Sequence, residues 1–231
     1  MNRHERRKQK KLTKEPPYFK VTDMTPFVLG SYIIKYKVPM TMINEINSQY
    51  DEATDLQNWS KNLAGKIRDE FRVDDILSEA TKNTFTACFQ KYLEVIQKQL
   101  WHVMLSNAWI NDMRAGEYNP FHFHSSTISD VGLSSVLCLK IPDTYGVEYT
   151  KEDEPSNGWL EFNGGQQDPL SISQLRQNVQ PGDLYIFPYT MLHGVYPFNG
   201  TDQVRRTLSF NCSLIKPGLI EESEMQQEYT A

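Results

Sequence analysis

The sequence is poor in cysteine and has no long apolar run. Its three cysteines, Cys88, Cys138 and Cys212, lie in apolar or alternating contexts without CxxC spacing. An odd number of cysteines with no secretory signal is typical of reduced cytoplasmic thiols that fill a core. No stretch of the chain reaches membrane-spanning length, so no membrane partner is expected.

A strong excess of charge of one sign is also missing. The chain has 24 basic and 29 acidic residues, and this net charge of -5 argues against a protein whose whole surface binds nucleic acid. The exception is the basic run 3–14, which has no apolar periodicity and no apolar segment after it. We therefore expect residues 1–15 to be a disordered tail, and residues 16–231 to form one domain.

The first part of this domain, residues 18–100, is expected to mix strands and helices. Two extended pieces are predicted at 18–21 and 27–38. Apolar residues at helical spacing then predict a helix around 42–50, a second over 58–71 and a third from Asp74 or Asp75 to Leu100. These helices are expected to pack on the β core that follows.

After residue 100 the chain changes to short strands separated by turn residues. Strands are predicted at 104–113, 118–124, 133–141, 158–162, 184–187, 193–196 and 205–214. Turns at this regular spacing predict an antiparallel sandwich or barrel over 104–215, followed by a tail at 216–231. The fold class is therefore α+β and mainly β, with an N-terminal helical layer.

Histidine is scarce, and three of the five histidines lie in the β region. His4 is in the basic tail and His102 is in an apolar run, whereas His122 and His124 are one residue apart on a predicted strand. Side chains alternate along a strand, so both imidazoles of this pair project from one face. Together with His193 they are predicted to hold a metal and to leave coordination positions open.

The last predicted strand begins with two arginines that point to opposite faces. Polar and apolar residues alternate after them, with Thr207, Ser209 and Asn211 against Leu208 and Phe210. If the polar set faces the interior, Arg205 shares that face. Arg206 then points the other way and is expected to be an exposed charge.

Alternation also orients two earlier strands. The strand before the histidine pair carries Asn107, Trp109 and Asn111 on one face, which is expected to line the pocket. Glu161 lies between two apolar residues that are expected to point inward. It is therefore expected to face solvent.

Five motifs follow one another in a specific order between residues 104 and 214. They are NPFHFH at 119–124, LSSVLCLKIP at 133–142, GWLEF at 158–162, PGDLYIFPYTMLHGVYP at 181–197 and RRTLSFN at 205–211. Together they resemble the iron(II)- and 2-oxoglutarate-dependent oxygenases. The resemblance is closest to the prolyl-hydroxylase-like branch of bacteria and marine phages.

This resemblance implies a double-stranded β-helix, or jelly-roll, with Fe(II) at one open end. His122 and His193 match two of the family's iron ligands. The third ligand is usually an Asp or Glu two residues after the first histidine, where this chain has His124. We expect His124 to be that ligand, with Asp130 as its rival because the segment that carries Asp130 is longer than usual.

The resemblance also implies a cosubstrate site. Arg205 is at the position that binds the far carboxylate of 2-oxoglutarate, and its planar fork suits bidentate binding. Thr207 and Asn111 are expected to add hydrogen bonds. With O2 as the third reactant, the implied reaction hydroxylates an unactivated C–H bond and releases succinate and carbon dioxide. The loops at 145–157 and 164–178 are the expected lids.

The substrate, a small molecule or a peptide, is not identified by any motif, and no nucleic-acid partner is expected. The implied location is the cytoplasm, or the host cytoplasm for a phage-encoded chain. Two other classes fit the same residues: a three-histidine cupin-type metalloenzyme that does not use 2-oxoglutarate, and a non-catalytic jelly-roll with a binding or structural role. Arg205 argues against the first of these, because such an enzyme needs no carboxylate clamp.

Overall fold

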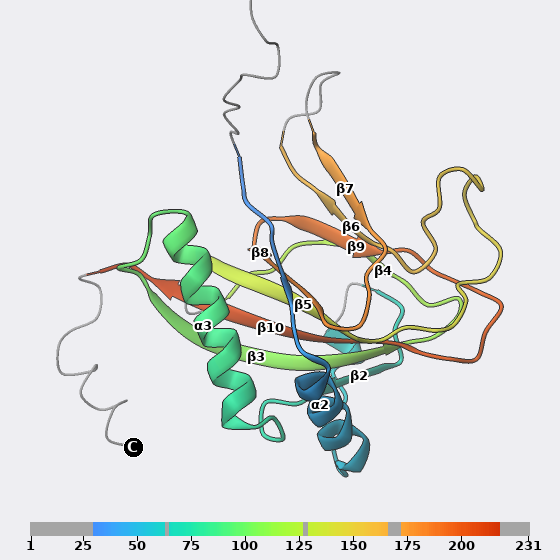
Figure 1. Ribbon diagram of the computed structural model, residues 1–231, viewed down its shortest axis with the longest axis horizontal. Coiled ribbons are helices and arrows are strands. Elements are labelled where there is room, and N and C mark those ends of the chain that lie inside the picture. Colours follow the sequence, from blue (N-terminus) through green and yellow to red (C-terminus); the bar gives the residue numbers. More distant parts are fainter. Residues whose placement is uncertain (1–29, 63–64, 127–128, 166–171, 218–231) are drawn as a thin grey trace, which may run out of the picture. The chain divides into compact units, whose positions relative to one another are not determined.

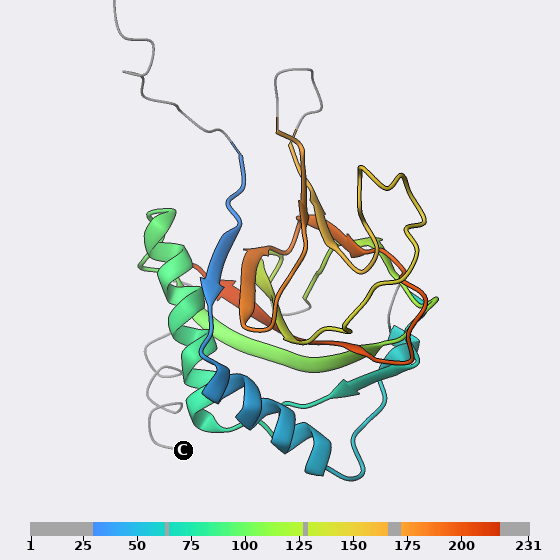
Figure 2. The ribbon, with the colours of Figure 1, turned by 45° about the vertical axis from the view of Figure 1, so that its right-hand side comes forward.

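Ten strands of the computed structural model form two antiparallel sheets, within the described residues 30–62, 65–126, 129–165 and 172–217. The larger sheet consists, in order, of β1 (Ile34–Lys37), β8 (Asp183–Pro188), β5 (Gly132–Lys140), β10 (Arg205–Ile215), β3 (His102–Met113) and β2 (Asp69–Arg72). The smaller sheet consists of β4 (Asn119–His122), β9 (Leu192–Val195), β6 (Leu160–Asn163) and β7 (Gln174–Gln177). The two sheets face each other (Figures 1 and 2).

The two faces of β10 explain why the sequence alternates there. Leu208, Phe210 and Leu214 belong to a core cluster on the outer face of the larger sheet. Thr207, Ser209 and Asn211, which alternate with Leu208 and Phe210, line the space that separates the two sheets. One strand therefore contributes both to the packing layer and to the interior of the β core.

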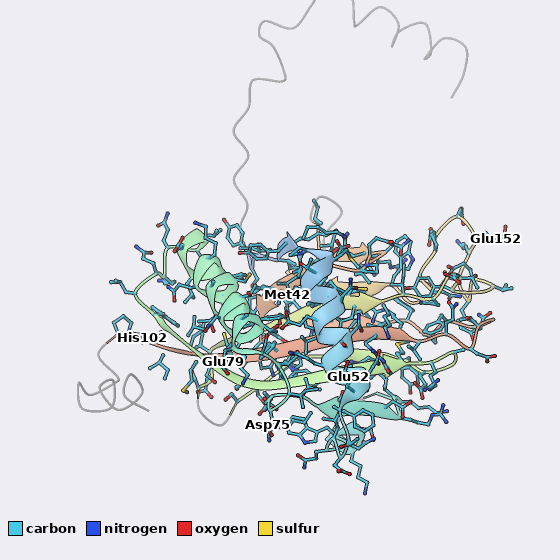
Figure 3. All side chains as sticks on the ribbon, turned by 60° about the horizontal axis from the view of Figure 1, so that its bottom comes forward. Met42, Glu52, Asp75, Glu79, His102 and Glu152 are labelled. Carbon is cyan, nitrogen blue, oxygen red and sulfur yellow. The ribbon has the colours of Figure 1, made fainter. Side chains whose placement is uncertain are left out.

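Two helices, α2 (Met40–Glu52) and α3 (Glu79–Val95), cover the outer face of the larger sheet (Figures 1 and 3). Ile43 and Ile46 of α2 are fully buried, as are Phe85 and Phe89 of α3. The ring of Phe85 lies 4.4 Å from that of Phe210, centroid to centroid, so α3 packs directly on β10. The predicted helical layer on a mainly β fold is confirmed.

The helix predicted over 58–71 is wrong. Asn58 starts a turn instead, because its side-chain oxygen accepts a hydrogen bond from the backbone N–H of Ser60. A short 3-10 turn, η1 (Ser60–Asn62), follows, and the chain then forms β2 at the edge of the larger sheet. Pairing with β3 supplies the backbone hydrogen bonds that a helix would otherwise make, and it outweighs the helical spacing of the apolar residues.

The third helix starts later than predicted. Ser78 is its N-cap and accepts a hydrogen bond from the backbone N–H of Thr81 at 3.2 Å. Asp74 does not cap the helix, because its carboxylate accepts the backbone N–H of Ala108 at 2.8 Å. This contact fixes the segment before α3 to β3.

A second core cluster fills the space between the sheets, with Val136 and Phe187 from the larger sheet and Leu160 and Phe162 from the smaller one. Glu161 points away from this cluster, yet it is only 1% exposed, so the predicted solvent-facing position is wrong. Side chains of the neighbouring strand β7 bind it: Gln174 donates a hydrogen bond to its carboxylate, and Arg176 forms an ion pair with it at 2.6 Å.

The cysteines and helices agree with their predicted structural roles. All three cysteines are unpaired, and Cys138 and Cys212 are buried. Burial raises the pKa of Cys138 to about 11 and that of Cys212 to about 12, so both remain thiols at neutral pH. In the described part of the chain, neither helix is long and apolar enough to cross a bilayer.

Arg206 is not the exposed charge that the alternation predicts. It is 6% exposed and binds Asp112 on β3 with two hydrogen bonds, of 2.6 and 2.8 Å. Asp51 of α2 accepts a third, at 2.7 Å, and the guanidinium carbon lies 4.4 Å from the ring centroid of Tyr50. Arg206 does point away from the interior of the β core, but α2 covers it, so it links the helical layer to the sheet.

Replacing Arg206 by alanine is therefore expected to lower stability strongly, because it leaves the 8% exposed Asp112 without its partner. Breaking a buried ion pair costs about 3–5 kcal/mol. Urea unfolding of Arg206→Ala measures this loss. The control is Lys91→Ala, which removes an ion pair of two exposed side chains on α3 and should cost less than about 1 kcal/mol. Equal losses in the two variants would contradict the structural role of Arg206.

Candidate metal centre and adjoining cavity

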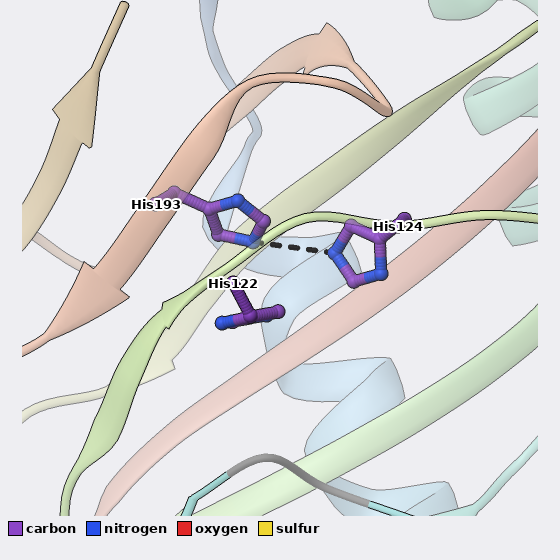
Figure 4. Close-up of side chains that lie close together, drawn as sticks. All are labelled: His122, His124 and His193. Atoms are coloured by element: carbon purple, nitrogen blue, oxygen red, sulfur yellow. Dashed lines mark hydrogen bonds between the residues drawn. The ribbon is translucent and has the colours of Figure 1, made fainter.

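Strand pairing brings the three predicted histidines together. His122 on β4 is directly opposite His193 on β9. His124 lies just beyond β4, where its backbone N–H donates to the carbonyl of Tyr189 at 2.9 Å and keeps the chain extended. The alternation along this segment then directs both His122 and His124 toward His193 (Figure 4).

The imidazole rings form one compact cluster. Each ring can offer one nitrogen such that the three nitrogens lie within 4.8 Å of one another. The Nε2 atoms of His124 and His193 are 3.2 Å apart, the contact drawn in Figure 4. Metal–nitrogen bonds of about 2.1 Å at right angles place neighbouring nitrogens ~3 Å apart. The donor set and its spacing fit a divalent metal with open coordination positions.

Backbone carbonyls orient two of the rings. Nδ1 of His122 donates to the carbonyl of Pro120 at 2.8 Å, and Nδ1 of His193 donates to the carbonyl of Met191 at 2.9 Å. A carbonyl oxygen only accepts, so the proton of each neutral ring is on Nδ1 and the lone pair is on Nε2. This is the usual arrangement of a metal-binding histidine.

All three histidines are held in their neutral form. Burial lowers the pKa of His122, and burial together with His193 and His122 lowers the pKa of His124 well below its usual value. Burial and the neighbouring His122 lower the pKa of His193 to about 3. At neutral pH the cluster therefore offers three lone pairs and no charge, as metal binding requires.

Asp130, the rival third ligand, is not part of this cluster. It is exposed, and the only group of potential metal ligands among the described residues consists of His122, His124 and His193. Residues 127–128, which precede it, lie outside the described part of the chain. The geometry thus favours His124.

A cavity of about 370 Å³ opens between the two sheets beside the histidines. This volume is within the usual range of small-molecule sites. Alternate residues of β3 and β10 form one wall, and the cavity is lined on that side by Asn107, Trp109, Asn111, Met113, Arg205, Thr207, Ser209 and Asn211. Among the predicted site residues, Arg205, Thr207 and Asn111 thus lie in the same cavity as the three histidines.

Arg205 is the cation of this cavity and is only 2% exposed. Its Nε donates to the carbonyl of Gly158 at 2.9 Å, which fixes the guanidinium. Its Nη2 has no hydrogen-bond partner among the described residues. A buried guanidinium with an unpaired donor is costly unless a ligand accepts from it, and a carboxylate is the acceptor that matches its geometry.

Tyr145 is a neighbour of Arg205 that sequence reasoning assigned only to a lid. Burial raises its pKa, and the positive charge of Arg205 opposes that rise. The loop that carries it is held by its own hydrogen bonds, since the side-chain amide of Asn157 donates to the carbonyls of Tyr145 and Val147. Gly158, with a φ of +68°, ends the loop against the Tyr145 ring, where a Cβ atom would lie 2.2 Å from it. The carbonyl of Gly158 thus positions Arg205, and the Tyr145 ring packs against Gly158.

The second predicted lid, 164–178, is partly regular structure. Residues 174–177 form β7, and residues 166–171 lie outside the described part of the chain. Sequence reasoning also missed Glu70, which lines the cavity from β2. Alternation along a strand would have pointed Glu70 toward the cavity, but the sequence predicted a helix over that segment.

The part of the chain that carries the histidines and Arg205 is similar to a known protein family. Residues 107–211 match a family model described as a putative 2OG-Fe(II) oxygenase. This segment includes all three histidines and Arg205. No curated protein sequence matches the chain.

Solved structures with the same fold share little sequence. A prolyl-4-hydroxylase from Pseudomonas putida is 15% identical, with a TM-score of 0.51 over 80% of this chain and 93% of that one. EvdO2 from Micromonospora carbonacea var. aurantiaca, complexed with 2-oxoglutarate, is 13% identical, with a TM-score of 0.53 over 83% and 91%. HygX from Streptomyces hygroscopicus, with nickel and 2-oxoglutarate bound, is 10% identical, with a TM-score of 0.53 over 83% and 85%. These likenesses confirm the predicted double-stranded β-helix.

Proposed function

We propose that this chain, whose family match and fold support the 2OG-Fe(II) oxygenase superfamily, is a three-histidine dioxygenase that hydroxylates an unactivated C–H bond. One observation carries the proposal. A single cavity contains three neutral imidazoles that suit a divalent metal and a buried guanidinium with an unpaired donor that suits a carboxylate. The two cofactors of the superfamily, Fe(II) and 2-oxoglutarate, require these two kinds of group.

His122, His124 and His193 would hold the iron through Nε2 of their rings. The carbonyls of Pro120 and Met191 keep two of these rings in the required tautomer and orientation. His124 replaces the more common carboxylate with a neutral ligand. The bound metal would thus keep one more unit of positive charge than in a two-histidine, one-carboxylate site, which favours an anionic cosubstrate.

Arg205 would bind the far carboxylate of 2-oxoglutarate with the donors that Gly158 does not use. Thr207 is next on the same face of β10, and Asn111 is directly opposite Thr207 on β3. Both side chains line the cavity and can extend the hydrogen-bonding surface for the cosubstrate. The iron and 2-oxoglutarate, when bound, supply the oxidising chemistry, in which O2 gives one oxygen atom to the substrate and one to succinate while carbon dioxide is released.

Apolar side chains lie next to the histidines in the cavity wall. Val136, Leu160 and Val195 contribute apolar surface next to the histidines. Apolar surface beside the metal site favours binding of a carbon centre there and limits side reactions of the oxidant with water. A cupin-type enzyme without 2-oxoglutarate does not need the unpaired guanidinium of Arg205. A non-catalytic jelly-roll needs neither this guanidinium nor the three histidines.

The proposal predicts a specific spectrum. Under anaerobic conditions, the protein with one equivalent of ferrous iron should develop a weak visible charge-transfer band when 2-oxoglutarate is added, because the cosubstrate chelates the metal through its carboxylate and oxo oxygens. The band should saturate at one 2-oxoglutarate per iron. Iron binding without the band would support the cupin-type alternative, and the absence of iron binding would support a non-catalytic module.

A further inference from the structure

Glu70 is a buried acid that the proposed reaction does not use. It is the only acidic residue among the described residues that line the cavity, and it is 2% exposed. Its Oε2 atom has no hydrogen-bond partner among those residues. A buried carboxyl oxygen without a partner is costly, so its presence in a cavity wall points to a ligand that supplies the missing donor.

The strand register places Glu70 on the far side of Asn111 from Thr207. Glu70 on β2 is opposite Asn111 on β3, which is in turn opposite Thr207 on β10. Neighbouring strands are about 4.8 Å apart, so Glu70 lies ~10 Å from Thr207 across the sheet. Glu70 therefore belongs to the part of the cavity that is left for the substrate.

The neighbours of Glu70 define the chemistry of this region. Trp59, whose backbone N–H donates to the carbonyl of Glu70 at 2.8 Å, lines the cavity together with Trp109. Asn119, also in the lining, has a buried amide oxygen without a partner among the described residues. The other charged or titratable groups of the lining are Arg205 and the three histidines, which are assigned to the cofactors. The guanidinium of Arg72, two residues after Glu70 on β2, lies over the Trp59 ring and pairs with Asp74, so it is already used within the protein. The unpaired oxygens of Glu70 and Asn119, in the same cavity lining as Trp109, match a nitrogen group with several N–H donors and a positive charge.

We propose that Glu70 binds a protonated amine or guanidinium of the substrate and thereby determines which molecule is hydroxylated. This inference rests on the proposed function, because it takes the rest of the cavity to be filled by iron and 2-oxoglutarate. The substrate class is then a cationic small molecule or a peptide with a basic side chain. Glu70 acts by positioning this group, while the carbon that reacts lies toward the histidines.

The state of Glu70 before binding gives the proposal a direct readout. Burial raises the pKa of Glu70 to about 8, so the free carboxyl is mostly protonated at pH 7. A bound cation favours the carboxylate, and the carboxyl proton then passes to the buffer. Calorimetry in buffers of different ionisation enthalpy should detect release of about one proton per cation at pH 7 and almost none at pH 9.5.

The test uses the wild-type protein loaded with Zn(II) and 2-oxoglutarate. Butylamine and propylguanidine are titrated as cationic probes, with butanol and propylurea as their neutral counterparts. A hydrogen bond to a charged group predicts a preference of ~10-fold or more for the cations. Equal affinity for the cationic and neutral probes, or no proton release, would overturn the inference. Binding of Zn(II) and of 2-oxoglutarate is measured first, before any probe is added. Failure to bind either of them would contradict the proposed function rather than this inference.

Variants then assign the preference to Glu70. Glu70→Gln, which is nearly isosteric, should bind Zn(II) and 2-oxoglutarate normally but lose the preference for cations. Glu70→Asp keeps a carboxyl group and should keep the preference with weaker binding. Glu79→Gln changes an exposed acid at the start of α3, outside the cavity lining, and should behave like the wild type. A preference that survives in Glu70→Gln would overturn the inference.

Discussion

Replacing His193 by alanine is expected to abolish metal binding. His193 is the most buried of the three imidazoles, and its Nε2 is 3.2 Å from that of His124, so its loss removes a ligand that solvent cannot easily replace. Loss of a group that only supports a metal ligand lowers affinity by about 10–100-fold, and loss of a ligand should exceed this. Anaerobic calorimetry with ferrous iron, or aerobic calorimetry with Mn(II), measures the effect.

The chain offers a matched control for this experiment. His102 is an exposed histidine at the start of β3, labelled in Figure 3, and His102→Ala should bind metal like the wild type. His122→Ala should behave like His193→Ala, because His122 is directly opposite His193 in the strand register. Full metal affinity in either of these two variants would contradict the proposed centre.

The third ligand is tested by a pair of variants. His124→Ala should lose most of the metal affinity, whereas Asp130→Ala should keep it, because Asp130 is exposed and lies outside the histidine cluster. His124→Asp would restore the carboxylate that is more common at this position and should bind metal. The reverse pattern for the two alanine variants would make Asp130 the ligand.

Arg205→Ala is expected to weaken 2-oxoglutarate binding by roughly 30-fold or more, while metal affinity changes little. Removing a buried charged partner of a carboxylate typically costs about 2–5 kcal/mol, and each 1.4 kcal/mol is about tenfold in affinity. Arg205 meets this condition because it is 2% exposed and has an unpaired donor in the cavity wall. Calorimetry with 2-oxoglutarate on the Mn(II)-loaded protein measures the loss.

Two controls separate the geometry of Arg205 from its charge. Arg205→Lys keeps the charge but not the planar fork, so it should recover only part of the affinity. Lys140→Ala removes a half-exposed positive charge at the end of β5 that does not line the cavity, and it should leave 2-oxoglutarate binding unchanged. A similar loss in Lys140→Ala would mean that net charge, rather than the clamp, governs binding.

The parts of the site that were predicted from the sequence depend on local alternation. His122 and His124 share a face because they are one residue apart on an extended segment, and Arg205 shares a face with Thr207 for the same reason. A strand repeat of two residues is fixed by the backbone and needs no knowledge of neighbours. The family resemblance supplied the order of the strands, which brings His193 to the pair.

The features that were missed depend on contacts between distant segments. Arg206 was expected to be exposed, but α2, which is more than 150 positions earlier in the sequence, covers it. Glu161 is buried by β7 in the same way. Glu70 was hidden because residues 58–71 carry helical spacing, while pairing with β3 makes this segment an edge strand. Alternation says which way a side chain points, and it does not say what covers it.

The most direct test of the account is a crystal structure of the protein with Mn(II) and 2-oxoglutarate, with the metal located by its anomalous scattering. The account predicts one metal bound by Nε2 of His122, His124 and His193, and a 2-oxoglutarate whose far carboxylate contacts the guanidinium of Arg205. A metal bound through Asp130, or a cosubstrate that does not contact Arg205, would contradict it.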